Sequence, residues 1–390
     1  MSLKELASCD LVPSQEWFYA GAQAVRDTVT KRTGAASLQC PLLVANANAQ
    51  VYGWGPGYST SYAPLNWMMC AFRISGAPLY DIAYGPIHNP GALGAQPSVF
   101  AIVVTGHLAL YSASLNQLAI SSSTVPTGSW QILLTEWDKS NGRVRAWLWN
   151  SATGVFDLWL SYSGALPSLQ IAYWGFFSLK TGGTLSFTGH VDDILWIDNQ
   201  GGPPNTIPIS PAECYAGFPI SGTPTHTAWT GTYADVDDLA AGGSNDGDTT
   251  KVNSGTGTAE VKETFEFTAG ICPGTRPIVG IGTSERGRVA SGSNGAVKHL
   301  LIGDGVEVSD EIYSYSASYS THAKLWSRTP SGQLWTPALV DGLEYGLVRE
   351  SGASDMRDYY CTDAHIAAAE CKLADLVPNV GMMGLSPAVF

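Results

Sequence analysis

The segment 130–149 constrains the fold most, because an Asn-Gly pair separates two strand-like runs in it. After the pair, Val144, Ala146 and Leu148 alternate with a second set, which is Arg143, Arg145, Trp147 and Trp149. Successive side chains of a strand point to opposite faces, so the two sets fall on opposite faces. Asn141-Gly142 is typical of a two-residue type I′ turn. The segment therefore predicts an antiparallel β-hairpin.

The rest of the chain has the composition of a β protein. It contains 43 Gly and 22 Pro, and 11% of its residues are aromatic, which suits short strands joined by tight turns. Hydrophobic residues make up 45% and charged residues 14%, enough apolar material for sizeable cores. At 390 residues the natural expectation is two domains. We predict an all-β protein with two consecutive β-sandwich (jelly-roll-like) domains.

Glycine and proline clusters suggest where the domains divide. The stretch "GGPPNTIPISPAE" forbids regular structure, so we place a Gly/Pro linker at 201–213. The first domain is then 1–200, with a short N-terminal arm, and the second is 214–378. The tail, 379–390, is apolar and uncharged, and is either disordered or buried against a neighbouring subunit.

In the second domain, strand-like runs alternate with Gly-rich turns. The segments that we expect to form strands are "VKETFEF", "RPIVGIGTSE", "AVKHLLIG", "EIYSYSASYSTHAKLW" and "EYGLV". Residues 356–372 fit either a returning strand or a short Ala-rich helix, and we favour the strand.

Charge and hydropathy exclude several partners. The formal net charge is −13, whereas binding to a phosphate backbone needs clustered Lys and Arg, so we expect no nucleic acid. The N-terminus has no apolar signal-peptide core, and no run of 18 apolar residues occurs, so we expect synthesis in a cytoplasm and no membrane insertion.

The metal-ligating residue types show no ligand spacing. The seven cysteines are widely separated and have no CxxC pair, which predicts buried reduced thiols; on one extended strand Cys361 and Cys371 would share a face. The seven histidines, with no HxH or HExxH, are expected at the surface or the edge of a core: His88, His107, His190, His226, His299, His322 and His365. No cofactor is expected.

Acidic clusters leave a structural calcium ion open as an alternative. They are Asp192 with Asp193, Asp235 with Asp237 and Asp238, and Asp246 with Asp248. Carboxylates are the ligands that Ca²⁺ prefers, but none of these clusters follows the EF-hand pattern. We expect solvated acidic turns.

The first half resembles a concanavalin A or laminin-G-like lectin sandwich, over about residues 10–200. The matching features, in the family's order, are Trp130, the apolar run 132–134, Asp138, Gly142, the strand 143–149 and the closing strand 189–197. The resemblance implies a fold rather than a function, because one fold hosts many functions.

That fold also hosts glycoside hydrolases, which need two suitably spaced carboxylates. The laminarinase-like members carry E-x-D-x-x-E on one strand. Here Glu136 and Asp138 take the first two places and Asn141 takes the third. The acid/base is missing, so we expect an acidic hairpin end and no enzyme; a polysaccharide depolymerase is the less favoured alternative.

The second half resembles a β-sandwich domain of bacteriophage virion structural proteins. Its matching residues are Trp229, Tyr233, Asp235, Asp237 and the "DGDTT" of 246–250, followed downstream by Pro330, Gly332, Trp335, Thr336 and the strand 343–347. The resemblance implies a virion protein: a fibre, tail-associated or capsid-decorating subunit in a symmetric homo-oligomer with other virion proteins.

Aromatic residues offer a second hypothesis, a glycan-binding host-receptor-binding protein. Trp54, Tyr58 and Tyr62 lie in or near a Gly/Pro/Ser loop, where a ring can stack on a sugar or plug the loop onto the sandwich. Trp147 and Trp149 either form an exposed contact patch or lie in a sheet that is covered on both faces. These five residues are our candidate surface contacts.

Overall fold

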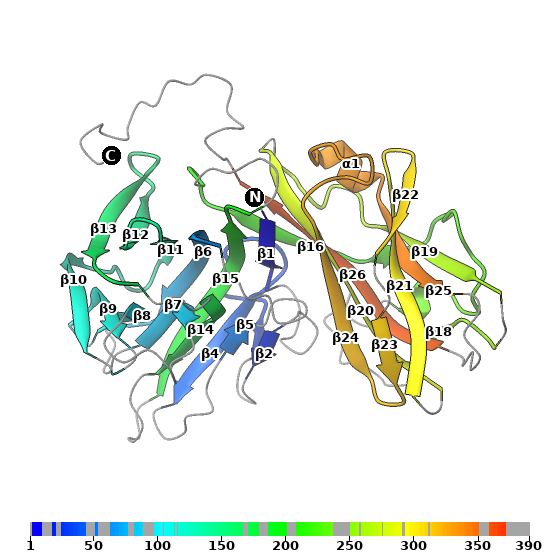
Figure 1. Cartoon of the computed structure of the whole chain (residues 1–390), viewed down its shortest axis with the longest axis horizontal. Helices are drawn as coiled ribbons and strands as arrows, with labels where there is room; N and C mark the ends of the chain where they lie inside the picture. The colour runs from blue at the N-terminus through cyan, green and yellow to red at the C-terminus, as the bar shows by residue number, and fades with distance from the viewer. Residues whose placement is uncertain are drawn as a thin grey trace.

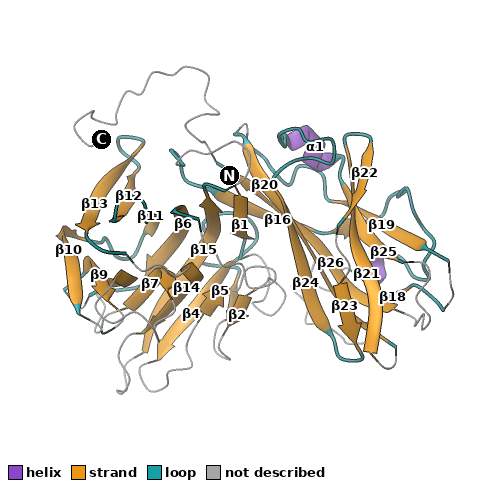
Figure 2. Ribbon diagram, viewed as in Figure 1, coloured by secondary structure: helices purple, strands orange, loops and turns teal. Residues whose placement is uncertain are grey.

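In a computed structural model of the chain, nearly all of the described regular secondary structure is β-strand (Figures 1 and 2), which confirms the all-β fold class. The structure describes residues 2–9, 18–20, 25–43, 51–53, 63–76, 82–88, 97–103, 105–112, 114, 116–166, 171–178, 186–200, 208–236, 250–256, 259–274, 276–290, 293–310, 313–350 and 359–371. The C-terminal tail and the loop with Trp54, Tyr58 and Tyr62 therefore lie outside the described residues.

Strands from the first half of the chain form two antiparallel sheets. The first sheet has the order β13-β12-β11-β6-β15-β4-β3, with β1 also paired to β15. Its strands are β13 (Val155–Ser163), β12 (Arg143–Asn150), β11 (Trp130–Asp138), β6 (Leu65–Ile74), β15 (Ser186–Asp198), β4 (Ser37–Leu43), β3 (Val25–Asp27) and β1 (Ser2–Ala7). The second sheet consists, in order, of β10 (Gln117–Thr124), β9 (His107–Ser112), β8 (Pro97–Ile102), β7 (Ile82–His88), β14 (Ile171–Ser178), β5 (Val51–Gly53) and β2 (Phe18–Ala20).

Strands from the second half form two further sheets. The third sheet has the order β16-β26-β20-β24, with β18 beside β26: β16 (Glu213–Gly217), β26 (Tyr359–Glu370), β20 (Ile278–Val289), β24 (Ser320–Trp326) and β18 (Val252–Asn253). The fourth has the order β17-β19-β25-β21-β22, with β23 beside β21: β17 (Pro219–Ile220), β19 (Val261–Phe267), β25 (Glu344–Arg349), β21 (Ser293–Gly303), β22 (Val306–Ser309) and β23 (Tyr313–Ser316). No described sheet mixes strands from the two halves.

The hairpin predicted at 130–149 is confirmed as β11 and β12, and Val144, Ala146 and Leu148 are buried in the first core. The predicted turn type is wrong. Asp138 pairs with Arg143, so the connection has four residues, and only Gly142 has a positive φ, of 59°. Asp138 accounts for the longer loop, because its carboxylate accepts hydrogen bonds from the backbone N–H and side-chain amide of Asn141, at 3.1 and 2.7 Å.

The two segments that suggested the virion resemblance meet in one core. Trp229 and Trp335 are 6% and 2% exposed and belong to the same buried cluster. Trp335 donates its indole N–H to the Trp326 carbonyl at 2.9 Å. Thr336 then caps the short helix α1 (Pro337–Asp341), with its hydroxyl accepting from the Leu339 N–H at 3.3 Å. The expected strands of this half are confirmed, including the strand in 356–372, which is β26, except that "EIYSYSASYSTHAKLW" forms two strands, β23 and β24, in different sheets.

A bulge in β26 overturns one expectation. Cys361 packs in the core of the second half, whereas Cys371, just after β26, packs with residues of the first. The register shifts between Asp363 and Cys361, so the two cysteines point in opposite directions despite their even spacing. The third sheet therefore contributes to both cores, and in Figure 1 it faces the first pair of sheets.

Within the described part of the chain, no helix has the length and apolar character needed to span a bilayer.

Candidate functional site

The best-defined polar site lies where β15 changes its neighbour. Residues 186–191 of β15 pair with β4, and residues 194–198 pair with β1 on the same side. Asp192 and Asp193 fill the gap between the two partner strands, where the register with β6 also shifts. Asp193 has a φ of 52°, which is unusual for a residue other than glycine. The bulge aims two adjacent carboxylates at groups outside the sheet.

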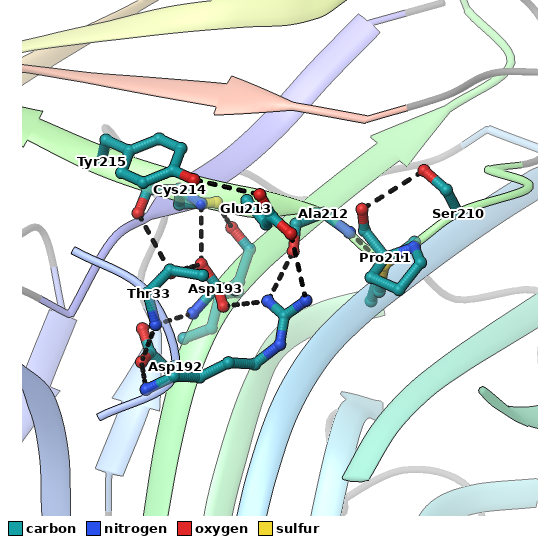
Figure 3. Close-up of polar contacts among 12 residues, drawn as sticks. Thr33, Asp192, Asp193, Ser210, Pro211, Ala212, Glu213, Cys214 and Tyr215 are labelled. Atoms are coloured by element: carbon teal, nitrogen blue, oxygen red, sulfur yellow. Dashed lines mark hydrogen bonds and ion pairs between the residues drawn. The ribbon is translucent and has the colours of Figure 1, made fainter. Parts of the chain in front are cut away.

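Asp193 connects the two halves of the chain (Figure 3). Its carboxylate forms an ion pair with Arg32, accepts a hydrogen bond from the Thr33 hydroxyl, and accepts the backbone N–H of Cys214 at 2.7 Å. The Arg32 guanidinium also donates to the Ala212 carbonyl at 2.8 Å. One side chain of β15 is thereby bonded both to the loop before β4 and to the first strand of the second half.

Asp192 holds the same loop from the other side. Its Oδ2 accepts the backbone N–H groups of Arg32 and Thr33, at 2.9 and 3.4 Å, and its Oδ1 accepts the Asp193 N–H at 2.9 Å. The two carboxylates are 0% and 1% exposed. The expectation of a solvated acidic turn is therefore wrong for this pair. Arg32 supplies the positive charge that a calcium ion would bring.

A second ion pair extends the contact along β16. The Glu213 Oε1 lies 3.8 Å from Arg32 Nη2 and 2.9 Å from Arg276 Nη1, and its Oε2 accepts the Tyr215 hydroxyl at 3.0 Å. Arg276 also donates to the Pro211 carbonyl at 3.3 Å. Burial and the neighbouring Glu213 raise the pKa of Tyr215 above the range in which a phenol ionises in solution.

Apolar contacts surround these charges. Ala212, Cys214 and Cys371 are at most 1% exposed, and the Cys371 thiol donates to the Ser210 carbonyl at 3.3 Å. The Ala212 N–H lies 3.0 Å from the Met69 sulfur. The described end of the predicted linker, 208–213, is therefore packed against both halves and is not a loose spacer. We call the set of Arg32, Asp192, Asp193, Ala212, Glu213 and Cys214 the junction clamp.

The protonation chemistry of the junction clamp follows from its burial. Complete burial raises the pKa of the Asp193 carboxyl, and the Arg32 charge and the hydrogen bonds from Thr33 and Cys214 oppose that rise. Because the carboxylate receives three partners, its acceptor capacity is largely used within the protein. The arrangement uses these buried charges to join two sandwiches.

The carboxylates considered for hydrolysis are engaged in the same way. Glu136 and Asp138 are 3% and 4% exposed. Arg145 donates to both oxygens of Glu136 at 2.9 Å, and Arg143 Nη2 lies 3.0 Å from Asp138. The indole N–H of Trp67 also donates to Glu136, at 3.3 Å. The two carboxylates thus form an acidic hairpin end that is neutralised by the arginines of the facing strand.

The two candidate contact tryptophans of β12, Trp147 and Trp149, differ in how much of their surface is exposed. Trp147 is 7% exposed and lies under the Arg145 guanidinium, at 4.8 Å from the ring centroid, so for this residue the covered sheet face is the correct alternative. Trp149 is half-buried and meets the Phe156 ring edge-on, with centroids 5.1 Å apart. Trp149 keeps some of its surface available to a partner.

A buried polar network in the second core was not predicted from the sequence. Glu285, on β20, is fully buried and accepts hydrogen bonds from the hydroxyls of Tyr315 and Tyr359. His299 is also fully buried, with its ring nitrogens 3.9 Å from Glu285 and 3.9 Å from Asp310. The prediction that every histidine lies at the surface or the core edge is wrong for His299. The glycine-rich sequence around Glu285 has no apolar alternation that would reveal its inward face.

Burial fixes the charge states within this network. It lowers the pKa of His299 to about 4, despite the nearby Asp310 carboxylate. It raises the pKa of both tyrosines well above the usual value, with Glu285 contributing to the rise. Neither ring nitrogen of His299 has a hydrogen-bond partner, nor does the Tyr345 hydroxyl. Such a network can respond to pH.

The remaining acidic candidates are turn residues or lie outside the described residues. Asp235 ends a short 3-10 turn, Tyr233–Asp235, and accepts both the N–H and the hydroxyl of Thr232, at 2.7 and 3.0 Å. Asp237, Asp238, Asp246 and Asp248 are outside the described residues. Among the residues that the structure describes, no group of three or more His, Cys, Asp or Glu side chains is arranged to hold a metal ion.

Comparison with known proteins gives structural similarity alone. No protein-family model and no curated protein matches the chain. Among solved structures, a cellulose-induced protein, Cip1, shares 13% identity over 51% of this chain and 92% of its own, with a TM-score of 0.35. Arcelin-5, a lectin-like defense protein from Phaseolus vulgaris, shares 10% over 49% and 96%, with a TM-score of 0.34. A carbohydrate esterase from Shiga toxin-encoding bacteriophage phi24B shares 12% over 49% and 98%, with a TM-score of 0.33.

Proposed function

We propose that this chain is a non-enzymatic structural protein of a bacteriophage virion that acts in assembly and surface contact. The virion setting comes from the sequence resemblance of the second half. The role in contact comes from the surface of the first half. Together they suggest a fibre, tail-associated or capsid-decorating subunit that associates with copies of itself.

The observation that carries the proposal is an apolar strip on two edge strands. Ile120 on β10 is 45% exposed and Leu158 on β13 is 47% exposed, while Val155, which is 39% exposed, points to the other face of β13. The two strands end their sheets within the described chain and lie next to each other, at the left of Figure 1. Exposed apolar side chains on a strand edge favour pairing with another chain. We name a second copy of this chain as that partner.

Two further features support a scaffold role. The junction clamp joins the two sandwiches through buried polar contacts. Such contacts keep the two sandwiches in a fixed arrangement, which suits a structural subunit. The carboxylates that hydrolysis would use, Glu136 and Asp138, are instead bonded to Arg143 and Arg145. In both features, paired acidic and basic side chains stabilise the fold.

Self-association can be measured directly by light scattering coupled to size exclusion. We expect the wild-type chain to form a symmetric oligomer and the double variant Ile120→Lys/Leu158→Lys to shift toward monomer. Val29→Lys is the matched control, because Val29 is 89% exposed but lies away from the strip. A monomeric wild-type chain, or an oligomer that the double variant leaves unchanged, would contradict the proposal that the strip is the contact between copies of the chain.

The virion setting needs a separate test. Quantitative mass spectrometry of purified particles should find the protein at a copy number set by the symmetry of a capsid or tail. Particles that lack it would refute the virion role without affecting the oligomer result.

Glycan binding is a second candidate function, favoured by the partly exposed pair of Trp149 and Phe156 beside the strip. Aromatic rings supply flat apolar surface for a sugar at low entropic cost. Loss of binding to a host-surface glycan in Trp149→Ala would support this function, as would loss in Trp54→Ala. Turnover of a polysaccharide that depends on Glu136 and Asp138 would instead favour the depolymerase.

A further inference from the structure

Cations and aromatic rings alternate across one end of the third sheet. The Lys251 Nζ lies 4.1 Å from the centroid of the Tyr360 ring, and the Arg288 guanidinium lies 4.9 Å from the same ring. Arg288 is also 5.3 Å from the Tyr319 ring, over which Arg286 lies at 4.3 Å. Across the sheet the groups are Lys251 just before β18, Tyr360 of β26, Arg286 and Arg288 of β20, and Tyr319 just before β24. We call these five residues the cation–ring row.

The strand register explains how the row forms. Asn253 of β18 pairs with Tyr360 of β26, and Tyr360 pairs with Arg288 of β20. The neighbours of these residues, Tyr359 and Val289, are buried in the second core. Alternation along a strand therefore turns Tyr360 and Arg288 to the opposite, outer face of the third sheet.

The outer face of this sheet is used in two different ways. At one end it packs on the first half of the chain, with Val279, Ala323 and Ala367 in the shared apolar cluster. Farther along β20 the face carries the cation–ring row, whose five side chains are half-buried. The row therefore keeps partial contact with solvent on this face.

The charge of the row contrasts with the rest of the chain. Only 20 of 390 residues are Lys or Arg, and the net charge is −13, yet three cations are held beside two rings. Like charges repel at such spacing, and each ring face stabilises a cation next to it. Arg288 is fixed further, because it donates to the carbonyls of Val289 and Ala290 at 3.0 and 3.4 Å.

From this geometry we infer that the cation–ring row is a binding site for an acidic polysaccharide, one whose sugars carry carboxylate or sulfate groups. Guanidinium and ammonium N–H groups bind such anions through charge-assisted hydrogen bonds. Ring-stacked arginines are pre-oriented, so less conformational entropy is lost on binding. The inference deepens the surface-contact function proposed above by naming the class of ligand.

A nucleic acid is the competing polyanion, and the row suits it less well. Single-strand binding relies on bases that stack on open aromatic faces. Here both tyrosine rings already have cations over them.

The first experiment measures binding of the full chain to polygalacturonate and to heparin by isothermal titration calorimetry, with dextran as the neutral control. We expect binding to an acidic polymer alone, weakened as NaCl is raised from about 0.05 M to about 0.3 M. Arg286→Gln/Arg288→Gln should weaken binding roughly tenfold or more, since each arginine contributes charge-assisted hydrogen bonds. Binding to a single-stranded DNA oligonucleotide but to neither polysaccharide would overturn the inference.

A charge-matched control separates the row from overall charge. Lys31→Gln/Lys298→Gln also removes two cations, which lie outside the row, and should change the affinity less than about twofold. Equal loss in both double variants would mean that net charge governs binding and would reject the site. Unchanged affinity in a folded Arg286→Gln/Arg288→Gln protein would mean that the row does not bind the polysaccharide and only stabilises the fold.

A second readout needs no substitution, in case the variant does not fold. Polygalacturonate is pre-activated as an N-hydroxysuccinimide ester, and a lysine amine displaces the N-hydroxysuccinimide to form an amide. Peptide mapping should find Lys251 modified ahead of Lys31 and Lys298, and free polygalacturonate should suppress that reaction. Absence of any preference for Lys251 would contradict the site. Neither experiment involves particles or oligomers, so its outcome is independent of the tests of the proposed function.

Discussion

Arg32 and Asp193 form an ion pair in which the guanidinium side chain is 13% exposed and the carboxylate side chain 1% exposed. The pair joins the loop before β4 to a bulge in β15; Arg32 also bonds to Ala212, just before β16, and Asp193 to Cys214 within β16. Two charges this deeply buried depend on each other, because neither can be resolvated when the other is removed. The connection between the two sandwiches therefore rests on a specific contact.

Asp193→Asn should destabilise the fold strongly. It removes the closer carboxylate partner of the buried Arg32 charge and leaves only the longer contact with Glu213, at 3.8 Å, so we expect a loss of about 3 kcal/mol in the free energy of unfolding. Urea denaturation at neutral pH measures this. Asp157→Asn is the control, because Asp157 is exposed and its carboxylate accepts one hydrogen bond from Asn150; we expect a change within about 0.5 kcal/mol. Equal effects of the two changes would contradict the importance of the junction clamp.

Glu263 should lower stability as the pH rises. Burial raises its pKa to about 7, although the carboxyl accepts the Trp229 N–H at 2.9 Å. Between the unfolded value of about 4.5 and about 7, the folded state holds the proton more tightly, so the free energy of unfolding falls with increasing pH. Glu263→Gln keeps an acceptor for Trp229 and should flatten this slope in urea titrations across that window. A slope equal to that of the wild type would exclude Glu263 as its source.

His299, in contrast, should lower the free energy of unfolding as the pH falls. Its pKa of about 4 lies below the unfolded value of about 6.5, so the unfolded state binds the proton first. Stability is complete above about pH 6.5 and is lost as the pH falls toward 4, by on the order of 3 kcal/mol. His299→Gln should remove that acid-sensitive portion. The measurement is the difference between variant and wild type at each pH, because Glu263 acts in an overlapping range; a constant difference would argue against the prediction.

The cysteines should resist alkylation in the folded protein. The six whose side chains the structure describes are all buried: Cys9, Cys70, Cys214, Cys272, Cys361 and Cys371. Burial raises the pKa of the Cys272 and Cys371 thiols to about 12, and only thiolates react. We expect iodoacetamide at about pH 8 to leave these six unmodified, and to modify all seven cysteines in guanidinium. Mass mapping that finds Cys371 labelled in the native chain would contradict the buried junction.

Local pattern predicted the strands well. In "RVRAWLWN" the alternation placed Val144 and Leu148 in the core, and in the second half each strand-like run became a strand except "EIYSYSASYSTHAKLW", which divides into β23 and β24 in different sheets. Apolar alternation works here because each of these strands has one face on a core. The turn after Asp138 was predicted wrongly, since a side-chain hydrogen bond to Asn141 selected a longer loop than the Asn-Gly pair alone favours.

Long-range partners decided what the charged residues do. From the sequence, Asp192 and Asp193 looked like a solvated turn, and Arg32 had no special feature. Their pairing spans about 160 positions, and no local pattern encodes it. The same holds for Glu285, which meets its tyrosines only when β20, β23 and β26 assemble.

The sequence by itself determined the all-β class, the hairpin of β11 and β12 and the strands of the second half, because these depend on side-chain alternation and turn residues a few positions apart. The tertiary structure alone decided that Asp193 binds Arg32, that the end of the linker is buried, and that Lys251, Arg286 and Arg288 gather around two tyrosines. Those outcomes depend on strand register and on one-residue bulges, which bring distant residues together and reverse the direction in which side chains point.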